Sequence, residues 1–419
     1  MKKLFALMLT LVMLFTMAAC GGTAEETKQT GTETGTEAET PAAVTPETES
    51  PESGTAADVS YNSPIEEALG YNCLITDDEL IFGAAPTRNG EEVIDGAALA
   101  AEFTQEEVEK IKNGGYTAYF ITCDNSSQWG ISMTQSITDG LAAMNIELLG
   151  VADAAHDQAT LNEMIESAIA LKPDVLIVEV IDPDATKAPL DMAREAGIKL
   201  VLRSQVPAGY VVNEDFYGCT VSDDYNMVYL GAKGMCEKIQ EGKVAYFVWG
   251  TINEMCQQRI DGFTAACAEY PGIELLELQY CSDMGQVAQL AESLYQAHPD
   301  LKGIGGHWDE VTVTAINAIE GLGGTVAGGC SGISENSALS SIQGKGETGF
   351  ISGGAECPVE MGATSVLLSC GALLEKEMPY YIGSQTILWN LDNLPEAWAM
   401  SYGIPLYDKL QSQWDALKK

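Results

Sequence analysis

From residue 116 onward, short apolar runs alternate with stretches in which apolar residues recur at helical spacing. The first runs, rich in β-branched and aromatic residues, fall at 116–122, 146–151, 175–180, 199–203 and 217–221, with helices expected at 132–143, 159–171 and 185–196. The second runs fall at 244–249, 273–280, 303–306, 325–329 and 349–352, with helices expected at 255–269, 286–298, 311–321 and 334–343. Apolar strands separated by helices are typical of parallel sheets covered on both faces. The pattern predicts the α/β class with two lobes.

Two such lobes suggest where a ligand would bind. Open parallel sheets bind ligands outside the carboxyl ends of their strands. Two lobes whose strand ends face each other therefore predict a cleft between them.

The first twenty residues have the pattern of an export signal. Lys2 and Lys3 precede an apolar run at 4–17, and small residues then lead to Cys20. A basic start, a short apolar stretch and small residues before the cut describe a secretory signal, and the stretch is too short for a membrane span. The cysteine at the junction resembles a bacterial lipoprotein signal, with Met17 where leucine is usual. This implies a signal peptide at 1–19, lipidation of Cys20 and anchoring to the outer face of the membrane; the alternative is a secreted protein cut near Ala19.

The segment after Cys20 is a linker in composition. Residues 20–58 consist almost entirely of Thr, Glu, Ala, Gly, Pro and Ser. Such a composition buries too little apolar surface to offset the entropy of ordering, so we expect a disordered acidic tether. Residues 59–115 form an N-terminal extension to which the sequence assigns no role.

Charge and cysteine content narrow the functional classes. The formal charge is −40, from 21 Lys and Arg against 61 Asp and Glu, which argues against binding to nucleic acid. The ten cysteines after Cys20 form no Cys-x-x-Cys pair, and we expect mostly reduced thiols. No Gly-x-Ser-x-Gly or Walker motif is present, and His307 with Glu310 is a poor metal site, so neither an enzyme nor a metal or other cofactor is expected.

Several segments occur in the order found in a known family. They are the apolar strand at 174–180, the helix and strand at 188–201, Thr-Val-Ser-Asp-Asp at 220–224, Arg-x-x-Gly-Phe within 257–263, Ala-His-Pro-Asp-Leu-Lys-Gly-Ile at 297–304 and Trp-Asp-Glu at 308–310. Together they resemble the sugar-binding proteins of bacterial ABC importers, the ribose-binding or type I periplasmic-binding class. The resemblance extends over about 116–398.

The resemblance implies a fold and a function. The fold would be two Rossmann-like lobes with parallel sheets joined by a three-strand hinge. The N-terminal lobe would comprise 116–224 and 357–379, and the C-terminal lobe and tail 225–356 and 380–419. The protein would be a monomer that captures a sugar, a polyol or a sugar derivative and delivers it to an ABC permease. The alternative is a lipoprotein that presents a bound solute to a membrane receptor.

The resemblance also indicates ligand-binding residues. Arg259 matches the ligand arginine of the family, and its guanidinium suits hydroxyl or carboxylate oxygens; the alternative is a surface pair with Asp261. Trp129 follows the first strand, where the family has an aromatic residue that stacks on the ligand, or it packs in the core. Trp308 stands where ribose binders carry Asn and would stack on the ligand. The other candidates are Asp223 and Glu356 at predicted lobe crossings, Asn125, Ser204 and Ser331.

Departures from the family pattern bear on the ligand. Where ribose binders have Asp-Arg after the fourth strand, this chain has Arg203-Ser204-Gln205, and residues 330–334 lack the expected Asp. Ribose is therefore not expected. A site with Arg259, Arg203 and fewer acids suits a polyol, another sugar or an acidic sugar derivative.

Overall fold

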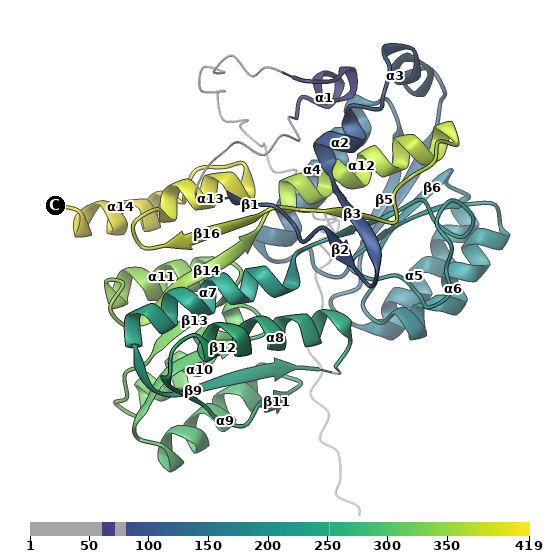
Figure 1. Ribbon diagram of the computed structural model, residues 1–419. Helices are drawn as coiled ribbons and strands as arrows, with labels where there is room; N and C mark the ends of the chain where they lie inside the picture. Colours follow the sequence, from purple (N-terminus) through teal and green to yellow (C-terminus); the bar gives the residue numbers. More distant parts are fainter. Residues whose placement is uncertain (1–60, 72–80, 251) are drawn as a thin grey trace, which may run out of the picture. The chain divides into compact units, whose positions relative to one another are not determined.

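The computed structural model describes residues 61–71, 81–250 and 252–419. These residues form two sheets of eight strands each, both flanked by helices (Figure 1). The prediction of an α/β fold with two mostly parallel sheets is confirmed. The predicted signal peptide, Cys20, the linker at 20–58 and Cys73 lie outside the described residues.

The first sheet, with its helices, is the N-terminal lobe. Its strands, in spatial order, are β2 (Thr87–Arg88), β3 (Glu91–Asp95), β15 (Tyr381–Gly383), β8 (Cys219–Val221), β7 (Lys199–Arg203), β6 (Val175–Glu179), β4 (Thr117–Thr122) and β5 (Glu147–Asp153). Every neighbouring pair is parallel except β2 with β3.

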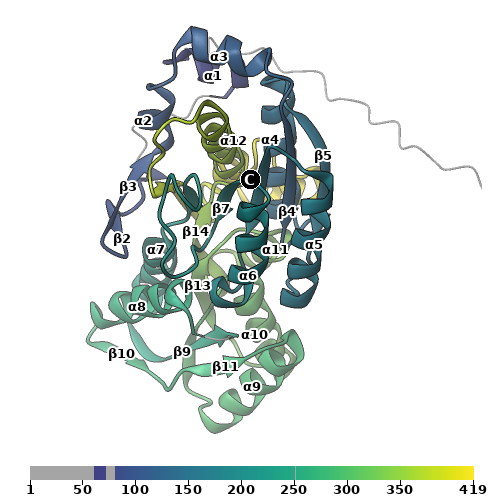
Figure 2. The same cartoon turned by 90° about the vertical axis from the view of Figure 1, so that its right-hand side faces the viewer.

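Helices cover both faces of this sheet, as the apolar strands predict (Figure 2). One face carries α1 (Pro64–Leu69), α2 (Gly96–Ala100), α3 (Gln105–Lys112), α4 (Gln128–Ala143) and α12 (Pro358–Leu374); the other carries α5 (Gln158–Leu171) and α6 (Pro183–Glu195). Successive strand residues point to opposite faces, so Ile177 enters the first core and Val178 the second.

The second sheet, with its helices, is the C-terminal lobe. Its strands are β1 (Ile81–Phe82), β16 (Thr386–Asn390), β14 (Gly349–Glu356), β13 (Ala327–Ser331), β12 (Leu301–Gly306), β9 (Glu241–Trp249) and β10 (Gly272–Leu275), with β11 (Gln279–Cys281) also paired to β9. The strands β1 and β16 run antiparallel to their neighbours. The single strand expected at 273–280 is thus two short strands, both beside β9.

Three groups of helices pack on this second sheet. The helices α7 (Asp224–Ile239) and α8 (Glu254–Ala268) share one core, and α9 (Met284–Ala297) and α10 (Asp309–Gly321) share another. The third core joins α11 (Glu335–Gly344), α13 (Leu394–Tyr402) and α14 (Asp408–Leu417) to β14 and β16. In it, the rings of Phe350 and Trp389 stack with centroids 5.1 Å apart.

After residue 116 the chain crosses between the two sheets three times. These crossings are 222–223 between β8 and α7, Cys357 between β14 and α12, and 384–385 between β15 and β16. The third crossing follows β15, so residues 381–383 lie in the first sheet although the sequence places them with the C-terminal lobe. The extension adds a fourth crossing at 83–86, because β1 belongs to the second sheet and β2 to the first.

Hydrogen bonds connect the crossings to one another. Ser384 N donates to Val221 O (2.9 Å), which joins the third crossing to the first. Ser222 Oγ donates to Glu356 Oε1 (2.9 Å), which joins the first to the second. The hinge is therefore one hydrogen-bonded unit rather than separate strands.

Two further observations concern the described residues only. None of their helices has both the length and the apolar character needed to cross a membrane. Nine cysteines among them are free thiols, and all but Cys123 are buried.

Candidate functional site

The N-terminal lobe contributes a buried ion pair at the carboxyl ends of two adjacent strands. Glu179 ends β6 and Arg203 ends β7, and the register pairs these two residues directly. Arg203 Nη1 lies 3.5 Å from Glu179 Oε1, and both side chains are almost fully buried. Glu179 Oε2 also accepts hydrogen bonds from Thr122 Oγ1 and from Cys123 N, each 3.0 Å long.

Trp129, in the first turn of α4, lies beside this pair. The Arg203 guanidinium carbon is 5.6 Å from the centroid of its ring, a cation–π distance. The half-buried Trp129 packs against apolar cores of both lobes, so it lies where the lobes meet.

Some donors in this region are buried without a hydrogen-bond partner in the described structure. They are Nε and Nη1 of Arg203 and Nε1 of Trp129. In the C-terminal lobe, Nδ1 of His307, which donates or accepts according to the tautomer of the ring, also has no partner. A buried polar group without a hydrogen bond costs about 1–3 kcal/mol, so native proteins rarely retain one without a reason. These polar groups, from both lobes, are therefore suited to a polar ligand.

The C-terminal lobe contributes Arg259, from α8. Its Nε donates to Asp224 Oδ1 (2.9 Å), its Nη1 donates to His307 O (2.9 Å), and its Nη2 lies 3.7 Å from Glu356 Oε1. Arg259 is buried, and Asp261, the surface partner that the sequence left open, accepts instead from Gln257.

Contacts at the hinge connect the two halves of the site. Met361 Sδ lies 3.9 Å from Arg203 Nη2 and 3.8 Å from Ser222 Oγ, and Ser222 in turn contacts Glu356. A continuous line of side chains thus runs from Arg203 in one lobe to Arg259 in the other.

Burial and neighbouring charges shift the pKa values of the ionisable groups in this line of side chains. Burial disfavours the charged Arg259, but the carboxylates of Asp224 and Glu356 outweigh it and raise the pKa of the guanidinium. Burial raises the pKa of Glu356, against the opposing effect of Arg259. Burial, helped by Arg259, holds the pKa of His307 well below its usual value, so its imidazole is neutral at pH 7.

The structure brings several of the predicted site residues together. Arg259 and Glu356 are near neighbours, and Ser331 Oγ donates to the same His307 carbonyl as Arg259 (3.1 Å). Trp308 precedes α10 and is half-buried, with its ring edge-on to that of Trp249 at 4.9 Å.

Three other residues predicted to bind the ligand lie outside this line of side chains. Asp223 caps α7, accepting from Asn226 N (2.9 Å), while its Oδ2 accepts from Ala85 N (2.8 Å), so its carboxylate already has partners within the protein. Asn125 is exposed and donates its backbone N–H to Asp153. The Ser204 carbonyl accepts from Arg88 Nη2 (3.4 Å), so this residue takes part through its backbone.

Sequence reasoning missed Glu179, Asp224 and Arg88. Glu179 carries a detectable signal, because it is a carboxylate inside the otherwise apolar run 175–180. Asp224 adjoins the candidate Asp223 in the motif at 220–224. Arg88 lies in the extension, which the resemblance does not reach.

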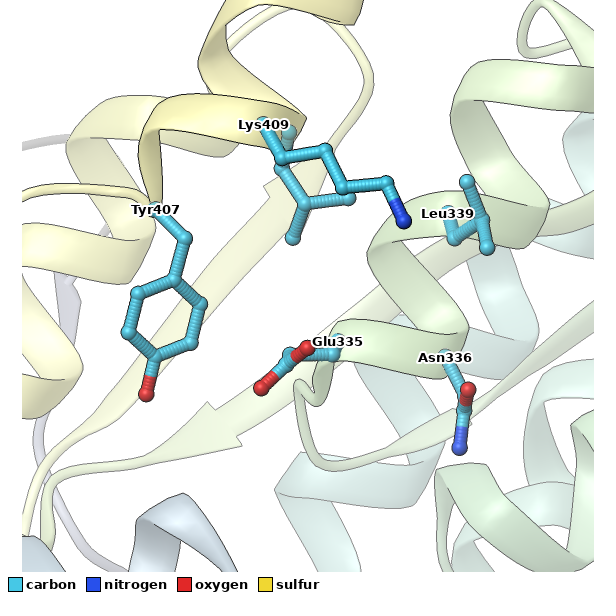
Figure 3. Close-up of a pocket in the computed structure, with 6 residues that line it drawn as sticks. Glu335, Asn336, Leu339, Tyr407 and Lys409 are labelled. Atoms are coloured by element: carbon cyan, nitrogen blue, oxygen red, sulfur yellow. The ribbon is translucent and has the colours of Figure 1, made fainter.

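No group of three or more His, Cys, Asp or Glu that suits a metal ion occurs within the described ranges. A pocket of about 340 Å³ lies between α11 and α14, lined by Glu335, Asn336, Leu339, Tyr407, Lys409 and Leu410 (Figure 3). It contains none of the residues of the line between Arg203 and Arg259.

The comparison with known families agrees with this fold. A model described as "Periplasmic binding protein domain" matches residues 118–344, more than half of the chain. The chain belongs to the periplasmic binding protein family. The matched range contains most of the site, including Trp129, Glu179, Arg203 and Arg259.

Curated relatives in this family are binding proteins. A putative rhizopine-binding protein of Rhizobium meliloti is 25% identical over 179 residues, which is 42% of this chain and 58% of the relative. A D-apiose import binding protein of Actinobacillus succinogenes is 25% identical over 179 residues, 41% of this chain and 56% of the relative. The chain thus spans somewhat more than half the length of these relatives, and both are named for binding rather than catalysis.

Solved structures of the family share the fold. An ABC transporter solute-binding protein from Agrobacterium vitis, bound with α-D-tagatopyranose, has a TM-score of 0.60 and 22% identity, covering 68% of this chain and 99% of its own. Another solute-binding protein, from Bacillus halodurans and bound with myo-inositol, has a TM-score of 0.57 and 19% identity. The match covers 69% of this chain and 99% of that protein. The architecture of this periplasmic binding protein is therefore that of ABC transporter solute-binding proteins.

Proposed function

We propose that this protein captures a neutral sugar or polyol between its two lobes and delivers it to an ABC permease. In this proposal the protein is extracytoplasmic, is held at the outer face of the cell membrane by a lipid on Cys20, and acts as a monomer without a cofactor. The acidic linker at 20–58 holds the folded body away from the bilayer.

The observation that carries the proposal is the line of buried polar side chains drawn from both lobes. The N-terminal lobe supplies Arg203, Glu179 and Trp129. The C-terminal lobe supplies Arg259 and His307, together with Glu356 at the end of β14, next to the second crossing. A ligand held by both sets favours the closed arrangement of the lobes, because only that arrangement supplies all of its contacts. Closure on a ligand is what a transporter needs to distinguish a loaded from an empty carrier.

Charge balance favours a neutral ligand. Three buried arginines, Arg88, Arg203 and Arg259, stand against four buried or nearly buried acids, Glu179, Asp223, Asp224 and Glu356. Each guanidinium already faces a carboxylate within 4 Å. A ligand with hydroxyl groups, which both donate and accept, suits such a set better than an anion, which would leave a carboxylate unpaired.

The relatives support the same class of ligand. The A. vitis and B. halodurans structures hold a sugar and a cyclic polyol, and an Actinobacillus succinogenes solute-binding protein of 22% identity and TM-score 0.57 holds D-allose. These ligands are neutral and carry several hydroxyl groups.

A thermal-shift screen of the purified protein tests the proposal. The panel contains myo-inositol, D-tagatose, D-allose and D-apiose, with glucuronate and glucosamine as charged counterparts. A ligand at about a hundred times its Kd adds about 2.7 kcal/mol to the stability of the folded state. We expect a rise in Tm with at least one neutral compound and none with glucuronate.

Two arginine variants make the screen specific to the site. Arg259→Met should abolish the shift produced by the neutral compound. Arg194→Met is the matched control, because Arg194 is partly exposed and pairs with Asp191 and Asp215 on the N-terminal lobe. A panel without any neutral hit, or a hit that survives Arg259→Met, contradicts the proposal.

A further inference from the structure

Residues 81–95 of the extension, here called the strap, join both sheets. In the strap, β1 pairs antiparallel with β16 of the C-terminal lobe, and β3 pairs in parallel with β15 of the N-terminal lobe. Between them, Ala85 N donates to Asp223 Oδ2 at the first crossing (2.8 Å). The strap is therefore fixed to both lobes and to the hinge by main-chain hydrogen bonds.

Arg88, at the end of β2, is the buried charge of the strap. Its Nη1 lies 3.1 Å from Asp224 Oδ2 and 3.1 Å from the carbonyl of Ser222, and its Nη2 lies 3.4 Å from the carbonyl of Ser204. The residue is only 7% exposed. One guanidinium thus contacts the end of β7 in one lobe, the first crossing, and the start of α7 in the other lobe.

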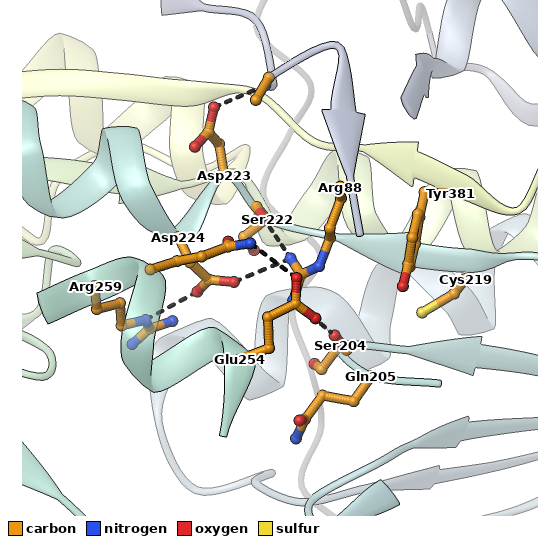
Figure 4. Close-up of polar contacts among 12 residues, drawn as sticks. Arg88, Ser204, Gln205, Cys219, Ser222, Asp223, Asp224, Glu254, Arg259 and Tyr381 are labelled. Carbon is orange, nitrogen blue, oxygen red and sulfur yellow. Dashed lines mark hydrogen bonds and ion pairs between the residues drawn. The ribbon is translucent and has the colours of Figure 1, made fainter. Parts of the chain in front are cut away.

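The Asp224 carboxylate is shared between two arginines (Figure 4). Its Oδ2 faces Arg88, and its Oδ1 accepts from Arg259 Nε at 2.9 Å. A carboxylate that is free on both oxygens pairs with arginine in a bidentate manner, through two parallel N–H···O bonds. Because Arg88 occupies Oδ2, Asp224 holds Arg259 by one oxygen only.

This sharing sets the orientation of Arg259. With Nε bound to Asp224 and Nη1 to the His307 carbonyl, Nη2 points toward Glu356, 3.7 Å away. That separation is too long for a hydrogen bond, so Nη2 can donate to a ligand hydroxyl. Without Arg88, the second oxygen of Asp224 would compete for Nη2.

We propose that Arg88 is a positioning residue of the ligand site, which holds Asp224 so that Arg259 keeps Nη2 directed at the ligand. The proposal rests on the function proposed above. It gives the N-terminal extension a role in ligand affinity, although Arg88 itself need not touch the ligand.

The test is a set of titration calorimetry measurements with the neutral compound identified in the screen. We expect Arg88→Met to weaken Kd about tenfold or more, as for the loss of one hydrogen bond to a charged group. In an Arg259→Lys background, which keeps the positive charge but has no Nη2 to direct, Arg88→Met should have no further effect on Kd, since its action passes through Arg259. Thr87→Ala, at the exposed residue of the same two-residue strand, should leave Kd within about twofold.

A rescue variant separates positioning from a general role in folding. Asn at 224 offers a single oxygen acceptor, so Asp224→Asn in the Arg88→Met background cannot pair with Arg259 through two oxygens. We expect this double variant to regain most of the lost affinity. Removing an unpaired buried charge can also restore stability, so the free energy of unfolding is measured on the same variants, and a Kd that recovers only in step with stability overturns the positioning role.

The outcomes distinguish the two proposals. If wild-type protein binds the compound and Arg88→Met binds it equally well, the role of Arg88 is overturned and the proposed function stands. If wild-type protein binds none of the panel, the proposed function fails and the role of Arg88 fails with it. Should Arg88→Met not fold, Arg88→Gln replaces it: this side chain is neutral and too short to take the place of the guanidinium on Asp224 Oδ2, so unchanged affinity in that variant also overturns the proposal.

Discussion

Arg203 carries a full charge in a side chain with no exposed surface, and its ion-pair partner is Glu179 on the neighbouring strand. Its Nε and Nη1 have no hydrogen-bond partner in the described structure, whereas Glu179 is also held by Thr122 and Cys123. The Glu179 carboxylate is therefore hydrogen-bonded within the protein, whereas the Arg203 guanidinium keeps N–H groups without a hydrogen-bond partner. This asymmetry is what a binding residue requires.

Substitution of Arg203 should reduce both stability and ligand binding, and a second substitution should restore only the stability. We predict that Arg203→Met lowers the free energy of unfolding by about 3–5 kcal/mol, because Glu179 is left as a buried, unpaired charge. Adding Glu179→Gln removes that charge and should restore most of the stability, yet neither variant should bind the neutral ligand. Urea denaturation and calorimetry measure the two effects; a double variant with wild-type Kd would show that Arg203 is not a ligand residue.

Sequence reasoning reached some of these residues and not others. Arg259 was found because the Arg-x-x-Gly-Phe motif is local and lies within a recognisable helix. Glu179 and Arg203 become neighbours only through strand pairing, which places residues 24 positions apart side by side. Asp224 belongs to the site because it pairs with two arginines, Arg88 and Arg259, that are distant from it in the sequence. The residues next to Asp224 in the sequence do not reveal these ion pairs.

At the scale of elements, the strap packs tightly on β15. A methyl group added at Gly383 would lie 2.3 Å from Cβ of Ala84 and 2.8 Å from Cγ1 of Val93. Glycine therefore allows the fourth crossing to lie directly beside the third. No larger residue fits there without displacing the strap.

A pair of substitutions tests this contact. We predict that Gly383→Ala destabilises the protein by about 1–3 kcal/mol, the usual cost of overpacking, and lowers Tm. Ala84→Gly in the same chain removes the nearer obstacle and should recover part of the loss. Gly321→Ala is the control, since a methyl group there meets no atom within 4 Å; equal effects at positions 383 and 321 would contradict the packing of the strap.

The elements themselves were largely predictable. The strands of the two parallel sheets follow from apolar runs, because burial on both faces leaves few polar positions within them. The strands β1, β2, β3, β15 and β16 were not predicted. Of these, β1 and β2 have two residues each and lie at sheet edges, where no apolar run is needed. Likewise, the break between β10 and β11 lies within the run expected at 273–280, where leucines continue across it at 275, 276 and 278, and hydropathy alone does not reveal it.

At the scale of the whole molecule, the site depends on segments that are far apart in the sequence. Arg88 comes from the extension, Arg203 from the N-terminal lobe, Arg259 from the C-terminal lobe and Glu356 from the second crossing. Hydrogen bonds join the crossings, so a ligand that contacts both lobes also acts on the hinge. The two-lobed plan follows from the sequence, whereas the fourth crossing depends on tertiary pairing alone.

A crystal structure of the protein with the neutral compound from the screen tests the central claim most directly. The account predicts the ligand between the lobes, with hydroxyl oxygens within hydrogen-bond distance of Arg203 Nε or Nη1 and of Arg259 Nη2. It also predicts that Asp224 still contacts both Arg88 and Arg259. A ligand bound instead in the pocket between α11 and α14, with no contact to Arg203 or Arg259, would contradict it.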